Sequence, residues 1–360
     1  MGTSRRAFNA TVKYLQQPGT KAVWKKIKGA ILNSLPAWAK ETPYQIRSLA
    51  IRDACKAVSA AKKKAKLGLG YQKVHFRSKR SPVQSCFIPK SAVVRGGIYP
   101  TLSRGEVRHV EAITKGHGDC RLICHDGRWY LAVPSTTKRL KSETQGRVVS
   151  LDPGIRSFQS FFAENGCGKF GRGDFGKIQR LCQHTDWFIS RMVREPRALR
   201  KKRMQQAVTR LRARIHDLVA ELHHKAALWL VKHYDVILLP TFETQQMVRR
   251  GARRLRRKSV RSMLTFAHYR FGQHLKHKAF EYGKMVLDVN EAWTSKTVSW
   301  TGEINVKLGG AKTVRSKTDG QEMDRDYNGA RGIFLRALGD QPILRSNLRD
   351  ASAPGAAHAA

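Results

Sequence analysis

The sequence has 360 residues, with 69 Lys plus Arg against 26 Asp plus Glu, so its formal net charge at pH 7 is +43. Self-repulsion of that size disfavours a compact chain, and we expect a polyanionic partner, nucleic acid being the obvious one. The sequence contains no apolar run long enough to span a bilayer, which excludes a membrane partner of that kind. The six cysteines form no CxxC pair and indicate free thiols. We expect a cytoplasmic, nucleoid-associated protein in a prokaryote, or a nuclear one in a eukaryote.

The first region, residues 1–67, is predicted to be a helical lobe. Apolar residues recur at helical spacing over residues 4–66, with a break at Pro36 and a new helix starting at Pro43. Residues 68–143 are predicted to form a small wedge-like β-barrel, because the apolar period changes to that of strands. The expected strands are 74–77, 86–88, 107–110, 121–124 and 129–133, and Asp126-Gly127 is a hairpin-turn signal.

The third region, residues 144–342, mixes strands and helices, so the chain as a whole is predicted to be a multidomain α+β protein. Strands are expected at 148–151, 157–162, 236–239 and 285–289, and helices at about 177–233, 266–282 and 326–338. Residues 343–360 are predicted to be a disordered tail. Two segments carry dense positive charge. Residues 191–214 contain ten Lys or Arg and one acid, and residues 249–261 contain eight and no acid, which favours a groove that follows a nucleic-acid backbone.

Three carboxylates stand at the ends of elements in this third region. Asp152 follows an apolar strand, Glu243 follows a second, and Asp326 opens the last helix. Hydrolysis of a phosphodiester needs an attacking and a leaving oxygen to be stabilised, and two Mg²⁺ ions held by converging carboxylates can do both. Ordinary alternatives exist for two of them, since Asp152-Pro153-Gly154 also suits a turn and Asp326 a helix cap. Their joint occurrence in a very basic chain indicates a nuclease.

These segments resemble the TnpB family of transposon-encoded proteins, relatives of type V CRISPR effectors and Fanzor proteins. The resemblance covers residues 5–340 or so and is carried by four motifs: Asp152-Pro153-Gly154-Ile155, Glu243 after Leu-Leu-Pro-Thr-Phe, Thr294-Ser295-Lys296-Thr297, and Asp324-Arg325-Asp326-Tyr327-Asn328-Gly329-Ala330-Arg331. It implies a RuvC nuclease domain of ribonuclease H-like fold over residues 144–342.

The resemblance also implies an RNA-guided DNA endonuclease with a transposon-derived guide RNA and target DNA as partners. By it, Asp152, Glu243 and Asp326 are the catalytic triad and the Mg²⁺ ligands, with Mn²⁺ as a possible substitute. Asp324 is expected to be outside the triad and to point away from Asp326 around the start of the helix, so that Asp324→Ala should be the milder variant.

The sequence departs from the family pattern in two places. Members commonly carry a zinc-binding CxxC…CxxC, and at the corresponding positions, within a degenerate insertion at about 294–322, this chain has Val298, Thr301, Ser316 and Asp319. None is a thiolate, so we predict no zinc. The chain also starts almost at the first lobe helix, so the strand that normally opens the barrel is expected to be missing, as in a shortened reading frame.

The leading hypothesis from the sequence is therefore a transposon-associated, RNA-guided DNA endonuclease that uses Mg²⁺. Two alternatives stay open. One is an RNA-guided DNA-binding protein without cleavage, and the other is a transposase that transfers DNA strands. The guide RNA, the target-adjacent motif, the cleavage pattern, the host and the oligomeric state are not determined by the sequence.

Overall fold

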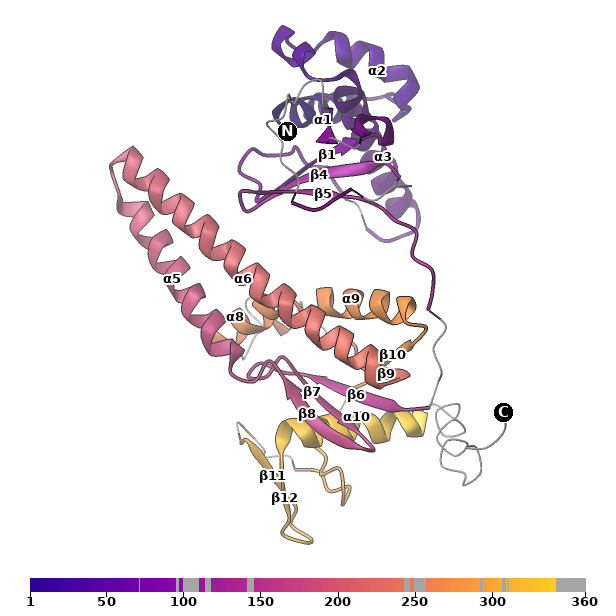
Figure 1. Cartoon of the computed structure of the whole chain (residues 1–360), viewed down its shortest axis with the longest axis vertical. Helices are drawn as coiled ribbons and strands as arrows, with labels where there is room; N and C mark the ends of the chain where they lie inside the picture. Colours follow the sequence, from indigo (N-terminus) through magenta and orange to yellow (C-terminus); the bar gives the residue numbers. More distant parts are fainter. Residues whose placement is uncertain are drawn as a thin grey trace. The chain divides into compact units, whose positions relative to one another are not determined.

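The computed structural model describes residues 1–70, 72–94, 97–99, 110–113, 118–140, 146–242, 247–248, 257–291, 294, 296–305, 309 and 311–340. Several sequence predictions fall outside these residues: residues 107–109 of the strand predicted at 107–110, Glu243, the basic residues 249–256 and the tail 343–360. The chain divides into two compact units, Met1–Thr136 and Thr137–Ala360 (Figure 1). The predicted helical lobe and the predicted β region both belong to the first unit.

The first unit begins with helices that share one core. They are α1 (Gly2–Leu15), α2 (Trp24–Asn33), the 3-10 turn η1 (Ala37–Glu41) and α3 (Tyr44–Lys66). Ile27, Ile31 and Leu35 repeat at helical spacing and are buried against α1 and α3, as predicted. Val23 is 42% exposed, because it precedes the first turn of α2.

A small antiparallel sheet completes the first unit. Strands β1 (Val83–Ile88), β4 (Cys120–His125) and β5 (Arg128–Ala132) pair in the order β1-β4-β5, with a short ribbon of β2 (Val93–Val94) and β3 (Gly97–Ile98), which follow the turn η2 (Lys90–Ala92). The hairpin at Asp126-Gly127 is confirmed, with both residues at positive φ. The prediction of a strand at 74–77 was wrong. The described residues do not close the sheet into a barrel.

Asp53 joins the helices of the first unit to its sheet. Its carboxylate accepts hydrogen bonds from the Arg121 guanidinium on β4 at 3.1 and 3.3 Å, and Arg77 lies 3.7 Å away. Arg121 also donates to Ser85 Oγ on β1 at 2.9 Å. A single carboxylate on α3 therefore ties two neighbouring strands to the helical layer.

The second unit is built on a mixed five-stranded sheet in the order β10-β9-β6-β7-β8. Strand β6 (Val148–Pro153) runs parallel to β9 (Val236–Pro240), which runs parallel to β10 (Met285–Val289). On its other side β6 pairs antiparallel with β7 (Gln159–Ala163), and β7 with β8 (Gly166–Phe170). Strand β8 was not predicted, because Gly166-Cys167-Gly168 lacks the apolar alternation of a strand.

Alternation along β6 divides its side chains between two cores. Val149 and Leu151 are buried with residues of α6 (Ala198–His233) and α9 (His268–Glu281), whereas Val148 is buried with residues of α10 (Arg325–Asp340). Asp152, two residues after Ser150, therefore faces the α10 side of the sheet. Figure 1 shows α10 on one face of the sheet and α6 and α9 on the other.

The predicted helix at 177–233 is two helices that form a long hairpin. Helix α5 (Asp174–Arg194) and α6 pack along each other and extend beyond the sheet (Figure 1). The chain turns at Glu195-Pro196-Arg197, where proline interrupts the helical hydrogen bonding. Helix α8 (Arg257–Phe266) precedes α9, and the short ribbon β11 (Thr313–Arg315) and β12 (Glu322–Asp324) precedes α10. No helix of the described residues is long and apolar enough to cross a membrane.

Two buried histidines stack on Phe158 in the core between the sheet and helices α6 and α9. The ring centroids of His223 and His268 lie 5.0 and 5.2 Å from that of Phe158. His223 Nε2 lies 2.8 Å from the Phe266 carbonyl oxygen and donates to it. Burial lowers the pKa of each imidazole to about 4, so both rings are neutral at pH 7.

Because His223 and His268 are buried as neutral rings, we expect the second unit to become less stable in acid. An unfolded histidine binds a proton below about pH 6.5, whereas His223 stays neutral down to about pH 4, so the unfolded state binds more protons between these values. Above pH 6.5 these histidines do not change the free energy of unfolding. Between about pH 6.5 and pH 4 each histidine lowers the free energy of unfolding by about 1.4 kcal/mol for every pH unit that the pH falls. Urea unfolding at pH 7, 6 and 5 measures the slope. His223→Gln should make the free energy of unfolding less dependent on pH, and substitution of the exposed His277 by Gln should not. Equal pH dependence in the two variants would show that His223 is not the source of the acid sensitivity.

Candidate active site

Asp152 lies in a row of polar side chains across three strands. It pairs with Ser160 on β7, and Ser160 pairs with Lys169 on β8. Residues directly opposite each other on neighbouring strands project from the same face of a sheet, so all three face α10. The row ends at Lys169, whose side chain is only 12% exposed. The sheet itself therefore brings a carboxylate and an ammonium group to one surface.

Helix α10 packs closely on this surface through small residues. Ser150 Oγ donates to the Ala330 carbonyl oxygen at 2.7 Å and thus fixes the helix against β6. A Cβ atom added to Gly329 would lie 2.5 Å from Asp152 Oδ2, which is closer than real Cβ atoms approach. Glycine at 329 therefore leaves the space that the Asp152 carboxylate occupies, and no other residue fits there without a shift.

Asp324 and Asp326 are both held by Lys169. The Lys169 ammonium lies 2.7 and 2.8 Å from the two carboxylate oxygens of Asp324 and 2.8 Å from Asp326 Oδ2. Asp324 Oδ1 also accepts the backbone N–H of Asp326 at 2.9 Å and is the cap of α10. The expectation that Asp324 points away from Asp326 was wrong, because the cap geometry turns its carboxylate toward the ammonium that Asp326 also contacts.

Burial and two neighbouring carboxylates disfavour the ionisation of Asp152. Burial, and then the negative charges of Asp326 and Glu291, raise the pKa of Asp152 to about 8. Burial also raises the pKa of Glu291. Hydrogen bonds from Lys169 and from the Asp326 amide oppose the effect of burial and lower the pKa of Asp324. Carboxylates that disfavour one another's ionisation form a site that a cation would stabilise.

The structure describes two of the three acids that the sequence predicted to be catalytic. Asp152 and Asp326 belong to one electrostatic cluster on the α10 face of the sheet. Glu243 follows β9 but lies outside the described residues. Strands β6, β9 and β10 are parallel, so their carboxyl ends lie at one edge of the sheet, where ligands bind in open α/β sheets.

Two residues of the cluster were missed. Glu291 comes two residues after the apolar strand β10, as Glu243 comes three after β9, and the same reasoning could have found it. No sequence signal distinguishes Lys169 from the chain's other cations, because its role depends on the register of β8. Asp152, whose carboxylate lies beside Gly329, and Asp326 both offer carboxylate oxygens, which are ligands that suit Mg²⁺ or Mn²⁺.

The four positions of the degenerate zinc insertion have other roles. Val298 is fully buried against Val314, and Ser316 Oγ accepts the N–H groups of Thr318 and Asp319. The Asp319 carboxylate accepts the N–H of the Trp300 indole at 3.0 Å and that of Gln321 at 3.0 Å. Thr301 Oγ1 lies 3.5 Å from the Glu303 amide. These side chains offer no thiolate and do not fit a structural zinc. The absence of zinc stays a prediction, which elemental analysis tests.

Glu303 joins the two halves of this insertion. Its carboxylate accepts the backbone N–H groups of Lys317 and Thr318, both at 2.9 Å, and the hydroxyls of Ser316 and Thr318. Hydrogen bonds from the Thr318 hydroxyl and the Lys317 amide lower the pKa of Glu303 to about 2. Asn328 on α10 accepts from the Ser299 amide and donates to the Thr297 carbonyl, which attaches the insertion to the helix of the site.

Glu303→Ala is therefore expected to loosen the insertion without unfolding the unit. Amide hydrogen exchange at Lys317 and Thr318 should become at least about tenfold faster, because both amides lose a charged acceptor. Glu322→Gln is the matched control, since its carboxylate only approaches Arg315 at 3.8 Å. Unchanged exchange in Glu303→Ala would show that the two halves are held together by other contacts.

A mixed sheet covered by helices on both faces, with carboxylates at the carboxyl edge of its parallel strands, makes the second unit the α/β part of an α+β multidomain protein. The family described as "Cas12f1-like, TNB domain" matches residues 268–333, which run from α9 through the insertion into α10.

Known proteins match the chain over a longer range. Protein A625R of Paramecium bursaria Chlorella virus 1, a candidate transposase, is 30% identical over 67% of this chain and 56% of its own length. TnpB-like protein L79 of Acanthamoeba polyphaga mimivirus is 26% identical over 59% of this chain and 41% of its own length. The chain is therefore similar to TnpB-like and transposase proteins over 59–67% of its length. It spans about half the length of these relatives.

Two solved structures are also similar to the chain. A Cas12f1–sgRNA–target DNA complex aligns at 12% identity and a TM-score of 0.36 over 92% of both chains. A CRISPR-Cas12f ternary complex aligns at 11% identity and a TM-score of 0.41 over 92% of this chain and 80% of the other.

Proposed function

We propose that this chain is an RNA-guided DNA endonuclease of the TnpB type, with Asp152, Glu243 and Asp326 as its catalytic carboxylates. The observation that carries the proposal is the meeting of Asp152 on β6 with α10, where Gly329 faces Asp152 Oδ2 and where Lys169, in the same cross-strand row as Asp152, contacts Asp326. Bound Mg²⁺ or Mn²⁺ would supply the charge that activates a water molecule and stabilises the leaving oxygen. RuvC chemistry, the division into domains 1–67, 68–143 and 144–342, and the absence of zinc belong to the same proposal.

The chain's own residues would perform three tasks in this reaction. Asp152 and Asp326 would hold the metal with oxygen ligands from a strand and a helix, with Glu243 contributing from the segment after β9. Gly329 keeps the helix from covering the Asp152 carboxylate. Asn328 and Ser150 hold α10 in place, so that the two carboxylates keep their separation while DNA is bound.

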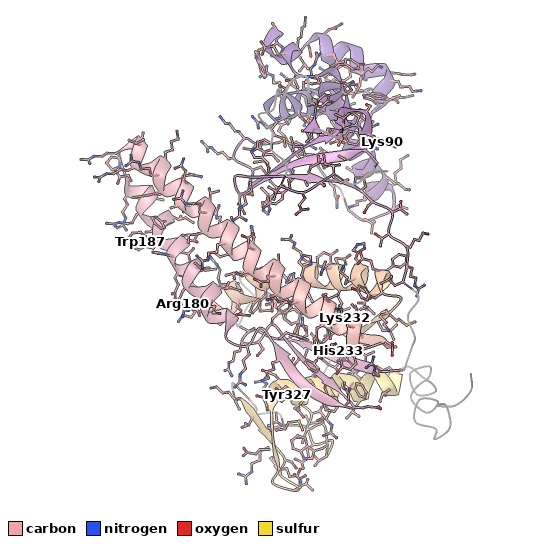
Figure 2. All side chains as sticks on the ribbon, viewed as in Figure 1. Lys90, Arg180, Trp187, Lys232, His233 and Tyr327 are labelled. Atoms are coloured by element: carbon pink, nitrogen blue, oxygen red, sulfur yellow. The ribbon has the colours of Figure 1, made fainter. Side chains whose placement is uncertain are left out.

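The basic face of the α5–α6 hairpin is the best candidate for nucleic-acid binding in the second unit. All ten Lys and Arg side chains between residues 191 and 214 are exposed, and none forms an ion pair with a described residue. Trp187, labelled on α5 in Figure 2, is 47% exposed and lies under the Arg191 guanidinium. Unpaired cations beside an exposed aromatic ring suit a phosphate backbone with stacked bases.

Neutralising part of this face is expected to weaken RNA binding. Replacing Arg200, Lys201, Lys202 and Arg203 by Gln should make the slope of log affinity against log salt about 3 units less steep, if each contacts a phosphate. The matched control replaces four lysines of the same unit that pair with acids, namely Lys177, Lys225, Lys276 and Lys278. Fluorescence anisotropy with a labelled RNA hairpin at four salt concentrations measures both slopes. Equal slopes would place RNA binding elsewhere.

The proposal as a whole is tested by purifying the chain with the RNA that it retains. We expect a structured RNA in the preparation, identified by sequencing, and Mg²⁺-dependent cleavage of a DNA library at sites complementary to it. Folded protein that carries no RNA, and that cuts no DNA with Mg²⁺ or Mn²⁺, would overturn the proposal.

RNA-guided binding without cleavage is the second candidate, and one observation favours it. The Lys169 ammonium occupies carboxylate oxygens that a catalytic metal would use. Target binding with no cleavage at any Mg²⁺ concentration would support this candidate.

A further inference from the structure

Lys169 contacts the carboxylates of both Asp324 and Asp326, whereas a surface ion pair usually joins one cation to one acid. Its ammonium lies within 2.8 Å of three carboxylate oxygens, two from Asp324 and one from Asp326. An ammonium group has three N–H donors, so each can be directed at one of these oxygens. The Tyr327 ring lies 4.8 Å from the same nitrogen and covers another side of it (Figure 2 labels Tyr327).

The position of this amine is set by the fold. Lys169 lies on β8 in the row that runs through Ser160 to Asp152, and both acids lie at the start of α10. A lysine on a paired strand has a fixed Cα, but its four-carbon side chain can still withdraw the ammonium. The fold therefore places the Lys169 ammonium at Asp324 and Asp326, and a change of side-chain rotamer can move it away from them.

We propose that Lys169 is the resident counter-cation of this site, which holds Asp324 and Asp326 in the metal-free protein and must release Asp326 before a divalent metal can bind there. The proposal rests on the proposed function, since it takes Asp326 as a metal ligand. An ammonium and a divalent cation cannot share Asp326 Oδ2 without strong repulsion. Lys169 therefore sets the metal concentration at which the site fills, and it is a positioning residue for the reaction.

Metal binding to the purified full chain tests this directly. The probe is Mn²⁺, followed by the electron paramagnetic resonance signal of the free ion, with Asp152→Asn used to identify binding at this site. Lys169→Met removes the charge and keeps the length of the side chain, and we expect its apparent Kd for Mn²⁺ to fall by about tenfold or more. Lys169→Arg keeps the charge and should stay within about threefold of the parent protein.

A matched control and a second variant keep the test decisive. Lys177→Met removes an exposed lysine whose ammonium is 3.8 Å from Asp174, and it should leave Mn²⁺ binding unchanged. If Lys169→Met does not fold, Lys169→Gln carries the same expectation. The Mg²⁺ concentration for half-maximal cleavage should fall in the same variants that bind Mn²⁺ more tightly.

The outcomes separate this proposal from the proposed function. If Lys169→Met binds Mn²⁺ no more tightly than the parent protein while the parent cuts DNA, the counter-cation role is wrong and the nuclease stands. If Lys169→Arg and Lys169→Met both bind more tightly, the effect comes from packing and the role is again wrong. If neither parent nor variant binds Mn²⁺ in a manner that depends on Asp152, the metal site fails and both proposals fall with it.

Discussion

Asp152→Ala and Asp326→Ala are each expected to abolish Mg²⁺-dependent DNA cleavage, with the rate falling at least about a thousandfold. Each residue supplies oxygen ligands from a different element, so neither can replace the other. Binding of RNA and of target DNA should persist, because the cations of the α5–α6 hairpin are untouched. Single-turnover cleavage by the purified RNA complex measures the rate. Glu243→Ala carries the same expectation from its sequence motif.

Two further variants make this prediction specific. Asp340→Ala, at the exposed end of α10, is the matched control and should cut at the parent rate. Asp324→Ala loses the cap of α10 and two contacts with Lys169, so we expect about 1 kcal/mol lower stability and partial retention of cleavage. An inactive Asp324→Ala beside an active Asp326→Ala would show that the wrong acid of this motif has been assigned.

Gly329→Ala should have the second-largest effect, although it adds only a methyl group. The new Cβ would meet Asp152 Oδ2 at 2.5 Å, so either the carboxylate or α10 must move. A displacement of this size at a catalytic group costs about a hundredfold in rate. The same displacement should weaken Mn²⁺ binding to the purified chain, which the resonance assay measures independently of cleavage.

The control for this variant lies on the same helix. A Cβ at Gly339 would meet no atom within 4 Å, so Gly339→Ala should leave both rate and metal binding unchanged and should slightly stabilise the helix. A fully active Gly329→Ala would mean that Asp152 can move without loss, and that its close contact with α10 has no role in the reaction.

The elements of the second unit with strong apolar patterns were predictable. Strands β6, β9 and β10 appear as apolar runs, and α10 opens where the acidic motif begins. Proline correctly marked the helix starts and breaks of the first unit, but the helical stretch predicted over about 177–233 placed no break at Pro196. Strand β8 could not be predicted, because its glycine-rich sequence is specified by pairing with β7 and not by its own pattern.

The sequence by itself determined the positive charge, the apolar runs that are followed by acids, and the replacement of the cysteines by Val298, Thr301, Ser316 and Asp319. These are local properties of residue type and spacing. Only the tertiary structure decided that Lys169 joins Asp324 and Asp326, that Glu291 acts on Asp152, and that Glu303 links the halves of the insertion. Strand register and helix docking bring together residues that are far apart in the chain, and no local pattern encodes which side chains will meet.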